Sequence, residues 1–261
     1  MGNELIRSLE GGIFTLALNR PKRHNALSPD LLAEIGLALD EAASRDDVRV
    51  VVLRGADAQP FSSGYDMGEI GTDPFTPARA RELQQPIRAV ARAMISLPKP
   101  VIGAAQRFVF GAALDVFAHC DLRVATTDTR FVLPPAKLGF SYPAEGLARM
   151  VDLVGASRVT EMALIAEPAD ASAMLQWGFL HRIWPVDRFE AELQQFAALL
   201  TTRAPLSLGA LKRSITALAG GADESVISAS YEDFARCLSS HDAREGKAAA
   251  TEKRTPRFTG R

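Results

Sequence analysis

The sequence predicts an α/β protein with an all-helical C-terminal region. Strand-like and helix-like segments alternate up to about residue 187, and residues 49–53 (RVVVL) form a nearly continuous apolar run, typical of a strand covered on both faces. From Arg188 onward no strand pattern occurs, and turn-forming residues divide this part of the chain into four helical segments. We therefore expect residues 1–187 to form an α/β core and residues 188–261 a helical region.

The composition excludes several classes of protein. With 261 residues, 47% of them hydrophobic and 23% charged, the chain is long enough to bury a substantial core. Lys and Arg (30 residues) nearly balance Asp and Glu (31 residues), so the net charge does not indicate a nucleic-acid or membrane-surface partner. Cys120 and Cys237 lack CxxC spacing, which argues against a zinc site and favours a reducing compartment. We expect a cytosolic protein, because the N-terminus lacks a signal-peptide pattern and no apolar run approaches the roughly 20 residues of a membrane span.

The first half of the core contains elements with clear boundary signals. Residues 13–18 (IFTLAL) alternate partly as a strand does, and Ser28 is a typical N-cap before Pro29, where an amphipathic helix begins. Residues 71–81 contain glycine, threonine, aspartate and two prolines, which favour a surface loop. Residues 84–97 then predict a second amphipathic helix, which a proline-rich segment ends.

The segment from Pro100 to Ala125 contains the first residues whose arrangement indicates a catalytic site. It predicts a strand (101–105), a tight turn, a helix and a further strand. Small residues at 111–113 allow the helix to begin close to a ligand, and its free N–H groups suit an oxygen that develops negative charge. Asp115 lies one turn further, where its carboxylate can transfer a proton in the same pocket. The alternative, that the small residues only pack closely and Asp115 only complements the helix dipole, stays open at this point.

The remainder of the core predicts shorter elements. Residues 131–139 read as the end of a strand followed by a loop, and two short helices over 146–154 and 157–166 are separated at Gly155. A helix, a glycine cap and a strand follow over 171–184. The alternation of helices and strands therefore continues to the end of the predicted core.

Five segments occur in a fixed order along nearly the whole chain. They are LNRPKRHNALS, VRVVVLRGADAQPFSSGYDMGEI, KPVIGAAQRFVFGAALDVFAHCDLRVA, the F-x-x-P-x-x-x-L-G run at Phe131, and the closing EKRTPRFTGR. Together they resemble the crotonase, or enoyl-CoA hydratase/isomerase, superfamily. The resemblance implies a crotonase-like spiral of ββα units and C-terminal helices that assemble trimers, often paired as hexamers. It also implies an acyl-CoA thioester as substrate, no further cofactor, and two backbone N–H groups that stabilise the thioester enolate.

The matched positions place the substrate-binding groups on a few segments. One oxyanion donor falls on the N–H of Tyr65, after the glycine of SSGYD, and the other on the N–H of Ala112, where the family usually has glycine. Asp66 matches the acidic residue of the turn, and we expect its side chain to hold nearby backbone amides. For coenzyme A, we expect the loop residues Lys22 and Arg23 to meet the phosphates. The remaining expected substrate contacts are Ser62, Ser63, Gly64, Asp66 and Gly111.

The acid/base positions differ from those of the family's hydratases, which use two glutamates. The first falls on Asp115, which is one methylene shorter, and the second on Pro135, which cannot transfer a proton. Residues 138–147 (LGFSYPAEGL) resemble the corresponding stretch of methylmalonyl-CoA decarboxylase, which makes Tyr142 a candidate catalytic residue, and Glu145 is a candidate substitute for the lost carboxylate. A packed tyrosine and an exposed loop glutamate are the plain alternatives. Isomerisation or decarboxylation is therefore expected to be easier than hydration.

Two other functions remain open from the sequence. A serine hydrolase would need Ser62 or Ser63 beside a histidine, but no histidine has a diagnostic spacing and no GxSxG motif occurs. A non-catalytic acyl-CoA-binding protein is compatible with the missing second carboxylate. In either acyl-CoA reading, we expect the loop at 71–81 to shape the acyl pocket.

Apolar residues at helical spacing in the C-terminal region predict an oligomer. We expect a single subunit to leave these faces uncovered, and the resemblance implies a homotrimer or a dimer of trimers. The residues concerned are Phe189, Leu193, Phe196, Leu199, Leu200, Val226, Ile227, Phe234 and Leu238.

Overall fold

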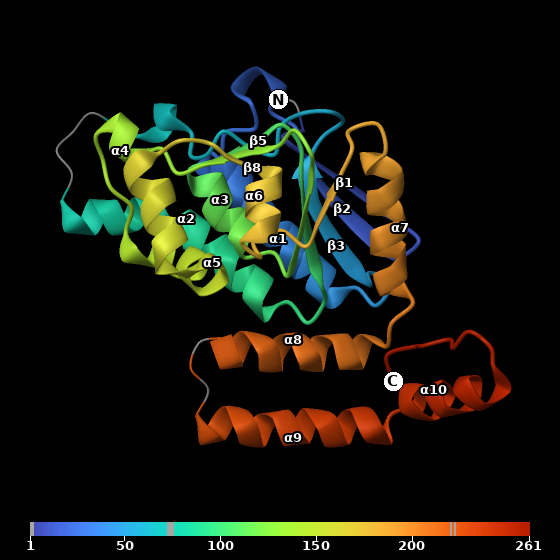
Figure 1. Cartoon of the computed structure of the whole chain (residues 1–261). Helices are drawn as coiled ribbons and strands as arrows, with labels where there is room; N and C mark the ends of the chain where they lie inside the picture. Colours follow the sequence, from blue (N-terminus) through green and yellow to red (C-terminus); the bar gives the residue numbers. More distant parts are fainter. Residues whose placement is uncertain (1–2, 72–75, 220, 222) are drawn as a thin grey trace.

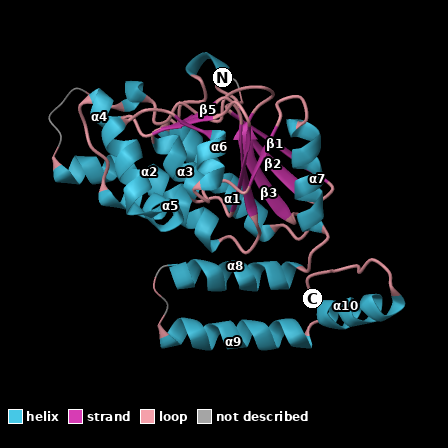
Figure 2. Cartoon of the chain, viewed as in Figure 1, coloured by secondary structure: helices cyan, strands magenta, loops and turns pink. Residues whose placement is uncertain are grey.

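Figure 1 shows a main sheet flanked by helices, with the last three helices set apart from it. The computed structural model describes residues 3–71, 76–219, 221 and 223–261. Within these residues the main sheet has six strands in the order β1-β2-β3-β4-β6-β9, all parallel except the β1–β2 hairpin. Figure 2 shows β1, β2 and β3 of this sheet in magenta. The parallel neighbours need crossover connections, which the helices supply. The strands are β1 (Leu5–Glu10), β2 (Ile13–Leu18), β3 (Val50–Gly55), β4 (Val101–Ala105), β6 (Leu122–Thr126) and β9 (Arg182–Trp184).

The first strand is one that the sequence did not predict. β2 and β4 have the boundaries that the sequence predicts, but β1 has only Leu5 buried and therefore carries little apolar pattern. Gly11 and Gly12 connect β1 to β2 with φ angles of 56° and 83°, a left-handed conformation that glycine adopts without strain. The hairpin is thus set by its turn and by its pairing with β2.

A second, smaller sheet lies next to the start of α3, since its strand β5 directly precedes that helix. Its strands pair in the order β5-β7-β8, with β5 parallel to β7 and β7 antiparallel to β8. β5 lies in the segment that the sequence predicts as a tight turn before the helix, and it is only three residues long. The passage from main sheet to small sheet to helix recurs along the chain and confirms the predicted ββα spiral. These strands are β5 (Phe108–Phe110), β7 (Arg130–Val132) and β8 (Ala169–Asp170).

The helices pack on both faces of the main sheet. Val51 and Leu53 of β3 join the larger core cluster, whereas Val50 and Val52 join a second cluster on the opposite face. This division follows from the alternation of side chains along a strand. Around the larger cluster pack α1 (Pro29–Ser44), α2 (Pro77–Ser96), α3 (Ala112–Ala118), α5 (Ala144–Ile165) and α6 (Ala171–Gln176).

One helix of the predicted C-terminal region packs on the sheet. α7 (Phe189–Thr201) covers the second face, where Phe189 and Leu193 are buried against β2, β3, β4 and β6 (Figure 1). These two residues therefore do not form an uncovered face, which corrects the expectation from their spacing. The predicted boundary after residue 187 falls just before α7, so the body that contains the sheet extends in space to Thr201.

The second amphipathic helix begins earlier than the sequence predicts. α2 starts at Pro77, because Thr76 caps it by accepting the N–H of Arg79 at 3.2 Å and proline suits the first helical position. Residues 77–81 are therefore helical and not part of a loop, while residues 72–75 of the predicted loop lie outside the described residues. By contrast, the predicted break at Gly155 is confirmed, since its φ and ψ of 80° and 156° interrupt α5.

The last three helices extend beyond the sheet. α8 (Pro205–Ala219) and α9 (Glu224–Ser239) lie side by side, followed by α10 (His241–Glu252) (Figure 1). Lys212 fastens α8 to the body, because its Nζ donates to the backbone oxygens of Met94 at 2.8 Å and Lys99 at 3.0 Å and pairs with Asp121 at 2.7 Å. None of the helices within the described ranges combines the length and hydropathy that a membrane span requires.

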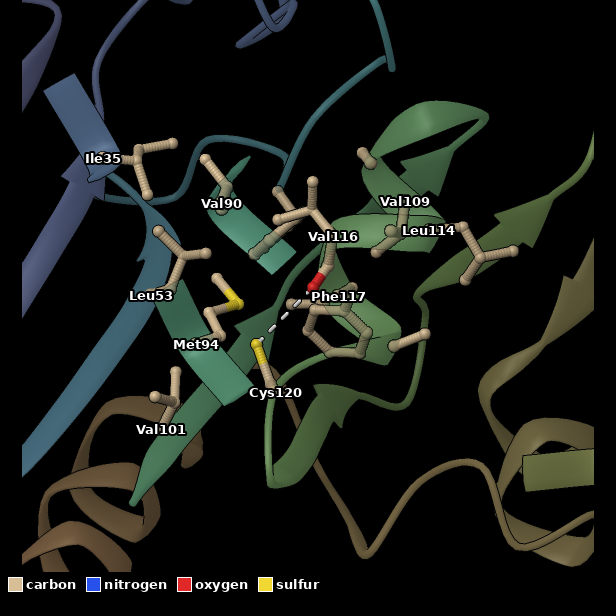
Figure 3. Close-up of a cluster of buried hydrophobic side chains, with 14 of the residues drawn as sticks. Ile35, Leu53, Val90, Met94, Val101, Val109, Leu114, Val116, Phe117 and Cys120 are labelled. Atoms are coloured by element: carbon tan, nitrogen blue, oxygen red, sulfur yellow. Dashed lines mark hydrogen bonds between the residues drawn. The ribbon is translucent and has the colours of Figure 1, made fainter. Parts of the chain in front are cut away.

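The central helix α3 sits directly on strand β4. Figure 3 shows Phe117 and Cys120 among the buried side chains of the core, together with Met94 and Val101, and the thiol of Cys120 lies 4.0 Å from the backbone oxygen of Val116. A Cβ on Gly103 of β4 would lie 2.7 Å from the ring of Phe117 and 2.8 Å from the sulfur of Cys120. The close approach of helix and strand therefore depends on a glycine, and it fixes the start of α3 against the sheet.

Candidate active site

Two segments far apart in the sequence meet at the N-terminus of α3. The backbone at Ser62 pairs in parallel with β5, and its carbonyl oxygen accepts the N–H of Phe110 at 3.1 Å. Gly64 follows with φ of 98°, and a Cβ there would lie 2.7 Å from the backbone oxygen of Phe110 and 3.4 Å from the nitrogen of Ala112. Only a residue without a side chain allows this approach. The loop that contains Tyr65 is thereby held against the start of α3.

The N–H groups of Tyr65 and Ala112 are the two predicted oxyanion donors. Among the described residues, no hydrogen bond takes either of them. The neighbouring N–H groups do form hydrogen bonds. That of Asp66 donates to the backbone oxygen of Leu27 at 3.0 Å, and that of Gly111 donates to the backbone oxygen of Val132 at 2.9 Å. Backbone donors without an acceptor at the start of a helix suit an oxygen that develops negative charge.

The loop around Asp66 is held by charge and by backbone contacts. Its Oδ1 accepts the N–H of Gly68 at 3.1 Å and its Oδ2 pairs with Arg20 at 3.0 Å, so both carboxylate oxygens stabilise the turn. Ser62 is fully buried and its hydroxyl accepts the N–H of Gly64 at 3.1 Å, so it does not stand as an exposed nucleophile. This arrangement disfavours the serine-hydrolase alternative.

The predicted coenzyme A loop lies next to this turn. Lys22 and Arg23 belong to a short 3₁₀ turn, Pro21–Arg23, and their side chains are exposed. The N–H of Ser63 donates to the backbone oxygen of His24 at 3.0 Å, which joins the two loops. Two exposed cations are thus placed beside the segment that contains Tyr65.

Asp115 lies in the first turn of α3, and its side chain is only 3% exposed. Its Oδ2 accepts a hydrogen bond from a guanidinium nitrogen of Arg88, which reaches across from α2. Its Oδ1 has no hydrogen-bond partner among the described residues, although Nδ1 of His119 lies 3.4 Å away. One oxygen of the carboxylate is therefore engaged, and the other is buried without a hydrogen bond among the described residues.

His119 lies one turn beyond Asp115 and is neutral near pH 7. Its Nδ1 is 2.8 Å from the backbone oxygen of Asp115, an arrangement in which a neutral ring donates its N–H. Burial, and then the positive charges of Arg88, Arg149 and Arg123, lower its pKa to about 4. His119 therefore adds no positive charge beside Asp115.

Tyr142 closes the site from the N-terminal side of α5. A Cβ on Gly111 would lie 3.2 Å from its hydroxyl, and a Cβ on Gly146 would lie 3.1 Å from its ring and 3.5 Å from Oδ2 of Asp115. Burial raises the pKa of the Tyr142 phenol well above its usual range, so the hydroxyl stays protonated and can donate a hydrogen bond. The Tyr142 side chain thus lies near Gly111, at the start of α3, and near Gly146, which approaches the carboxylate of Asp115.

The two remaining sequence candidates have different surroundings. The side chain of Glu145 is exposed, and it is its backbone oxygen that accepts a hydrogen bond from Arg88 at 3.2 Å. Pro135 is buried at the first position of α4 (Pro135–Leu138), directly after β7, where the family's hydratases have their second glutamate. No carboxylate stands at that matched position.

Sequence reasoning missed Arg88, the charged partner of Asp115. The apolar spacing of α2 predicts which face of that helix is buried, with Ile87 and Ala91 on it, but Arg88 sits at the edge of this face. Its contact with Asp115 joins residues 27 positions apart on different helices. An arginine bordering the buried face of a helix is the one signal that the sequence offers.

The fold is an α/β spiral whose candidate site combines two backbone N–H groups without an acceptor among the described residues and a buried carboxylate. Enoyl-CoA hydratase/isomerase is the family that matches, over residues 8–261, and the chain belongs to it.

Individual relatives match over almost their whole length. A probable enoyl-CoA hydratase of Mycobacterium leprae is 34% identical over 256 residues, which cover 95% of this chain and 96% of that protein. A 1,2-epoxyphenylacetyl-CoA isomerase of Escherichia coli is 28% identical over 263 residues, or 98% of each chain. The crystal structure of an enoyl-CoA hydratase/carnithine racemase from Magnetospirillum magneticum has a TM-score of 0.93 at 27% identity, covering 100% of this chain and 97% of that chain.

Proposed function

We propose that the chain is an enzyme that converts an acyl-CoA thioester through an enolate. The thioester oxygen is held by the N–H groups of Tyr65 and Ala112 while negative charge develops on it. The observation that carries this proposal is that the two N–H groups lie on segments in direct contact and have no acceptor among the described residues. Donors fixed in place before the reaction stabilise the enolate without reorganisation.

Asp115 is the group that moves the proton. Its Oδ1 is free of hydrogen bonds among the described residues, and it lies in the same first turn of α3 as the oxyanion donor at Ala112. A single carboxylate suffices to take a proton from one carbon and return it to another, which is isomerisation, or to steer protonation of an enolate formed by decarboxylation. The protonated hydroxyl of Tyr142 is a second donor in reach of this chemistry.

Hydration is the less favoured reaction. It needs a second group to hold and activate water, and Pro135 supplies none at the matched position. The Escherichia coli relative named 1,2-epoxyphenylacetyl-CoA isomerase is an isomerase of this family, whereas the Mycobacterium leprae relative is named a hydratase. The absent second carboxylate favours isomerisation or decarboxylation here.

The remaining parts of the proposal concern binding and assembly. Lys22 and Arg23 meet the phosphates of coenzyme A, and the backbone of residues 62–66 holds the pantetheine end. No cofactor other than the thioester itself takes part. The chain works in the cytoplasm as a homotrimer or a dimer of trimers, assembled through the exposed apolar faces of α8 and α9.

The experiment that tests the function is turnover of crotonyl-CoA and longer enoyl-CoA thioesters. Product is followed by the absorbance of the conjugated thioester and by chromatography with mass detection. Asp115→Asn is expected to lose nearly all turnover, because an amide does not accept the proton. Binding of these thioesters without any conversion would instead make the chain a non-catalytic acyl-CoA-binding protein.

The preference against hydration has its own test. The natural chain is expected to hydrate crotonyl-CoA slowly, since the shorter carboxylate of Asp115 is set back by about one bond and misplacement by ~1 Å costs on the order of 10²-fold. Asp115→Glu combined with Pro135→Glu is expected to gain hydration, and either single substitution serves as the control. Rapid hydration that survives Asp115→Asn would contradict the assignment.

A further inference from the structure

A second charged side chain, Arg88, stands beside Asp115, and the proposed reaction does not use it. Its side chain is 13% exposed, and its two terminal nitrogens donate to Asp115 and, at 3.2 Å, to the backbone oxygen of Glu145. Its Nε is buried and has no partner among the described residues. A guanidinium carries five N–H groups, and a buried donor without an acceptor is unfavourable. Arg88 therefore retains capacity to bind an anion.

Several arginines lie around Asp115, while the carboxylate of Glu145 acts on Arg88 with the opposite charge. Arg88, Arg149 and Arg123 all act electrostatically on His119. The guanidinium of Arg123 is satisfied by the backbone oxygens of Phe179 at 2.7 Å and Cys120 at 2.5 Å, so no carboxylate neutralises it directly. In a buried site, where water screens charges weakly, such surroundings attract an anion.

If the thioester binds as the proposed function requires, the far part of the acyl group lies near Arg88. The thioester oxygen binds at the N–H of Ala112, and Asp115 lies three residues further along α3, or roughly 4.5 Å along the helix axis. Arg88 contacts Asp115 from α2, on the side opposite the backbone of α3. An acyl chain that passes Asp115 therefore brings its distal carbons toward the guanidinium.

We propose that Arg88 binds a carboxylate on the acyl group, so that the substrate is the CoA thioester of a dicarboxylic acid. This inference rests on the proposed function and names its substrate class. The planar guanidinium matches a carboxylate through two parallel hydrogen bonds. When the substrate carboxylate takes Arg88, Asp115 is released from its ion pair and both of its oxygens serve proton transfer. An uncharged acyl chain leaves Arg88 on Asp115, so Arg88 selects the substrate by charge.

Binding of unreactive saturated thioesters tests the inference without turnover. Succinyl-, glutaryl- and adipyl-CoA are compared by titration calorimetry with valeryl-, hexanoyl- and heptanoyl-CoA, in which an ethyl group replaces the terminal carboxylate. A charged hydrogen-bonded pair predicts that at least one dicarboxylyl thioester binds roughly 10- to 100-fold tighter than its uncharged match.

Variants assign the preference to Arg88. Arg88→Met is expected to abolish it while leaving the affinity for uncharged chains nearly unchanged. Arg88→Lys keeps the charge but loses the planar fork, so it is expected to retain only part of the preference. Because Arg88→Met leaves Asp115 buried without its partner, the double variant Arg88→Met with Asp115→Asn is measured as well. Arg92→Met, an exposed arginine one turn along α2, is the matched control and is expected to keep the preference.

Each outcome decides the inference. Equal or tighter binding of the uncharged thioester at every chain length overturns it and leaves the proposed function standing. A preference that persists both in Arg88→Met and in the double variant with Asp115→Asn also overturns it, since another group then binds the carboxylate. Failure of every CoA thioester to bind overturns the proposed function together with this inference.

Discussion

In the proposed site, Tyr65 and Ala112 contribute backbone N–H groups, so their side chains can vary while the donors stay. Ala112 stands where the resemblance implies glycine, and the residue is only 6% exposed. Gly64 is different, because a side chain there would collide with the backbone of Phe110. The sequence therefore constrains the site most strongly at the glycine that brings the two donors together.

The donor at Ala112 can be removed without breaking the helix. Ala112→Pro deletes the N–H at the first helical position, where proline is tolerated, and the expected loss of turnover is ~10²–10³-fold. Tyr65→Phe keeps its backbone amide and is expected to change turnover little. Ala112→Gly, which retains the donor, is the control for folding. Loss of activity in Tyr65→Phe together with a folded, active Ala112→Pro would refute the assignment.

The two kinds of site residue differ in how well the sequence predicts them. The N-terminus of α3 and the carboxylate one turn later follow from local signals, small residues and helical spacing, and these predict the first half of the site. Arg88 escapes prediction because its contact depends on how α2 packs against α3, which no local pattern encodes. The resemblance likewise makes Tyr142 a candidate but gives no indication of the guanidinium that contacts Asp115.

Among the elements, α3 and β4 hold the site in position. Gly103→Ala would place a methyl group within 2.8 Å of Phe117 and Cys120, both fully buried, so the helix must move away from the strand. Such overpacking is expected to lower the free energy of unfolding by about 1–3 kcal/mol, measured by urea denaturation. Gly36→Ala in α1, where nothing lies within 4 Å, is the control and is expected to stabilise the helix slightly.

Helix α3 also makes the stability of the protein depend on pH. His119 has a pKa of about 4 in the folded chain, below the ordinary 6.5, so between these values the unfolded chain binds more protons. Stability is therefore full above pH 6.5 and decreases as the pH falls toward 4. From pH 7 to pH 5 the contribution of His119 falls by roughly 2 kcal/mol.

The variant His119→Gln isolates this contribution. It is expected to show a smaller decrease in the free energy of unfolding between pH 7 and pH 5 than the natural chain. His241→Gln, which changes a histidine whose side chain is 54% exposed, is the control for substitution at a surface position. An unchanged slope in His119→Gln would show that its charge state is the same in both states of the chain.

Elements that carry a continuous pattern are predicted well, and those that depend on a partner are not. β2 and β4 are half-buried or fully buried runs and have the boundaries expected from sequence. β1 and β5 are an exposed edge strand and a three-residue strand, and both exist because a neighbouring strand supplies their hydrogen bonds. α2 begins early, at Pro77, because Thr76 caps it; in the sequence the prolines of this stretch indicate a loop instead.

On the scale of the whole molecule, the helices after α7 are held in a fixed place relative to the body. The closing segment returns to Arg49, which donates to the backbone oxygen of Phe258 at 2.5 Å. The buried carboxylate of Asp242 accepts the N–H groups of Thr259 at 2.7 Å and Gly260 at 2.8 Å, which ties this segment to α10. Together with Lys212 of α8, these contacts connect the C-terminal helices to the body.

The exposed apolar faces of α8 and α9 lead to the prediction of a homo-oligomer. α8 and α9 expose several large apolar side chains, among them Ile215 at 65% and Phe234 at 60% exposure, and apolar side chains gathered on exposed helices are typical of an interface. Size-exclusion chromatography with light scattering is expected to give a trimer or a hexamer of the 28.1 kDa chain. Ile215→Asp with Phe234→Asp is expected to dissociate it, because a charge buried in an apolar interface is unfavourable. Leu37→Asp, at an exposed leucine of α1, is the matched control and is expected to leave the mass unchanged. A monodisperse monomer of the natural chain at micromolar concentration would refute the prediction.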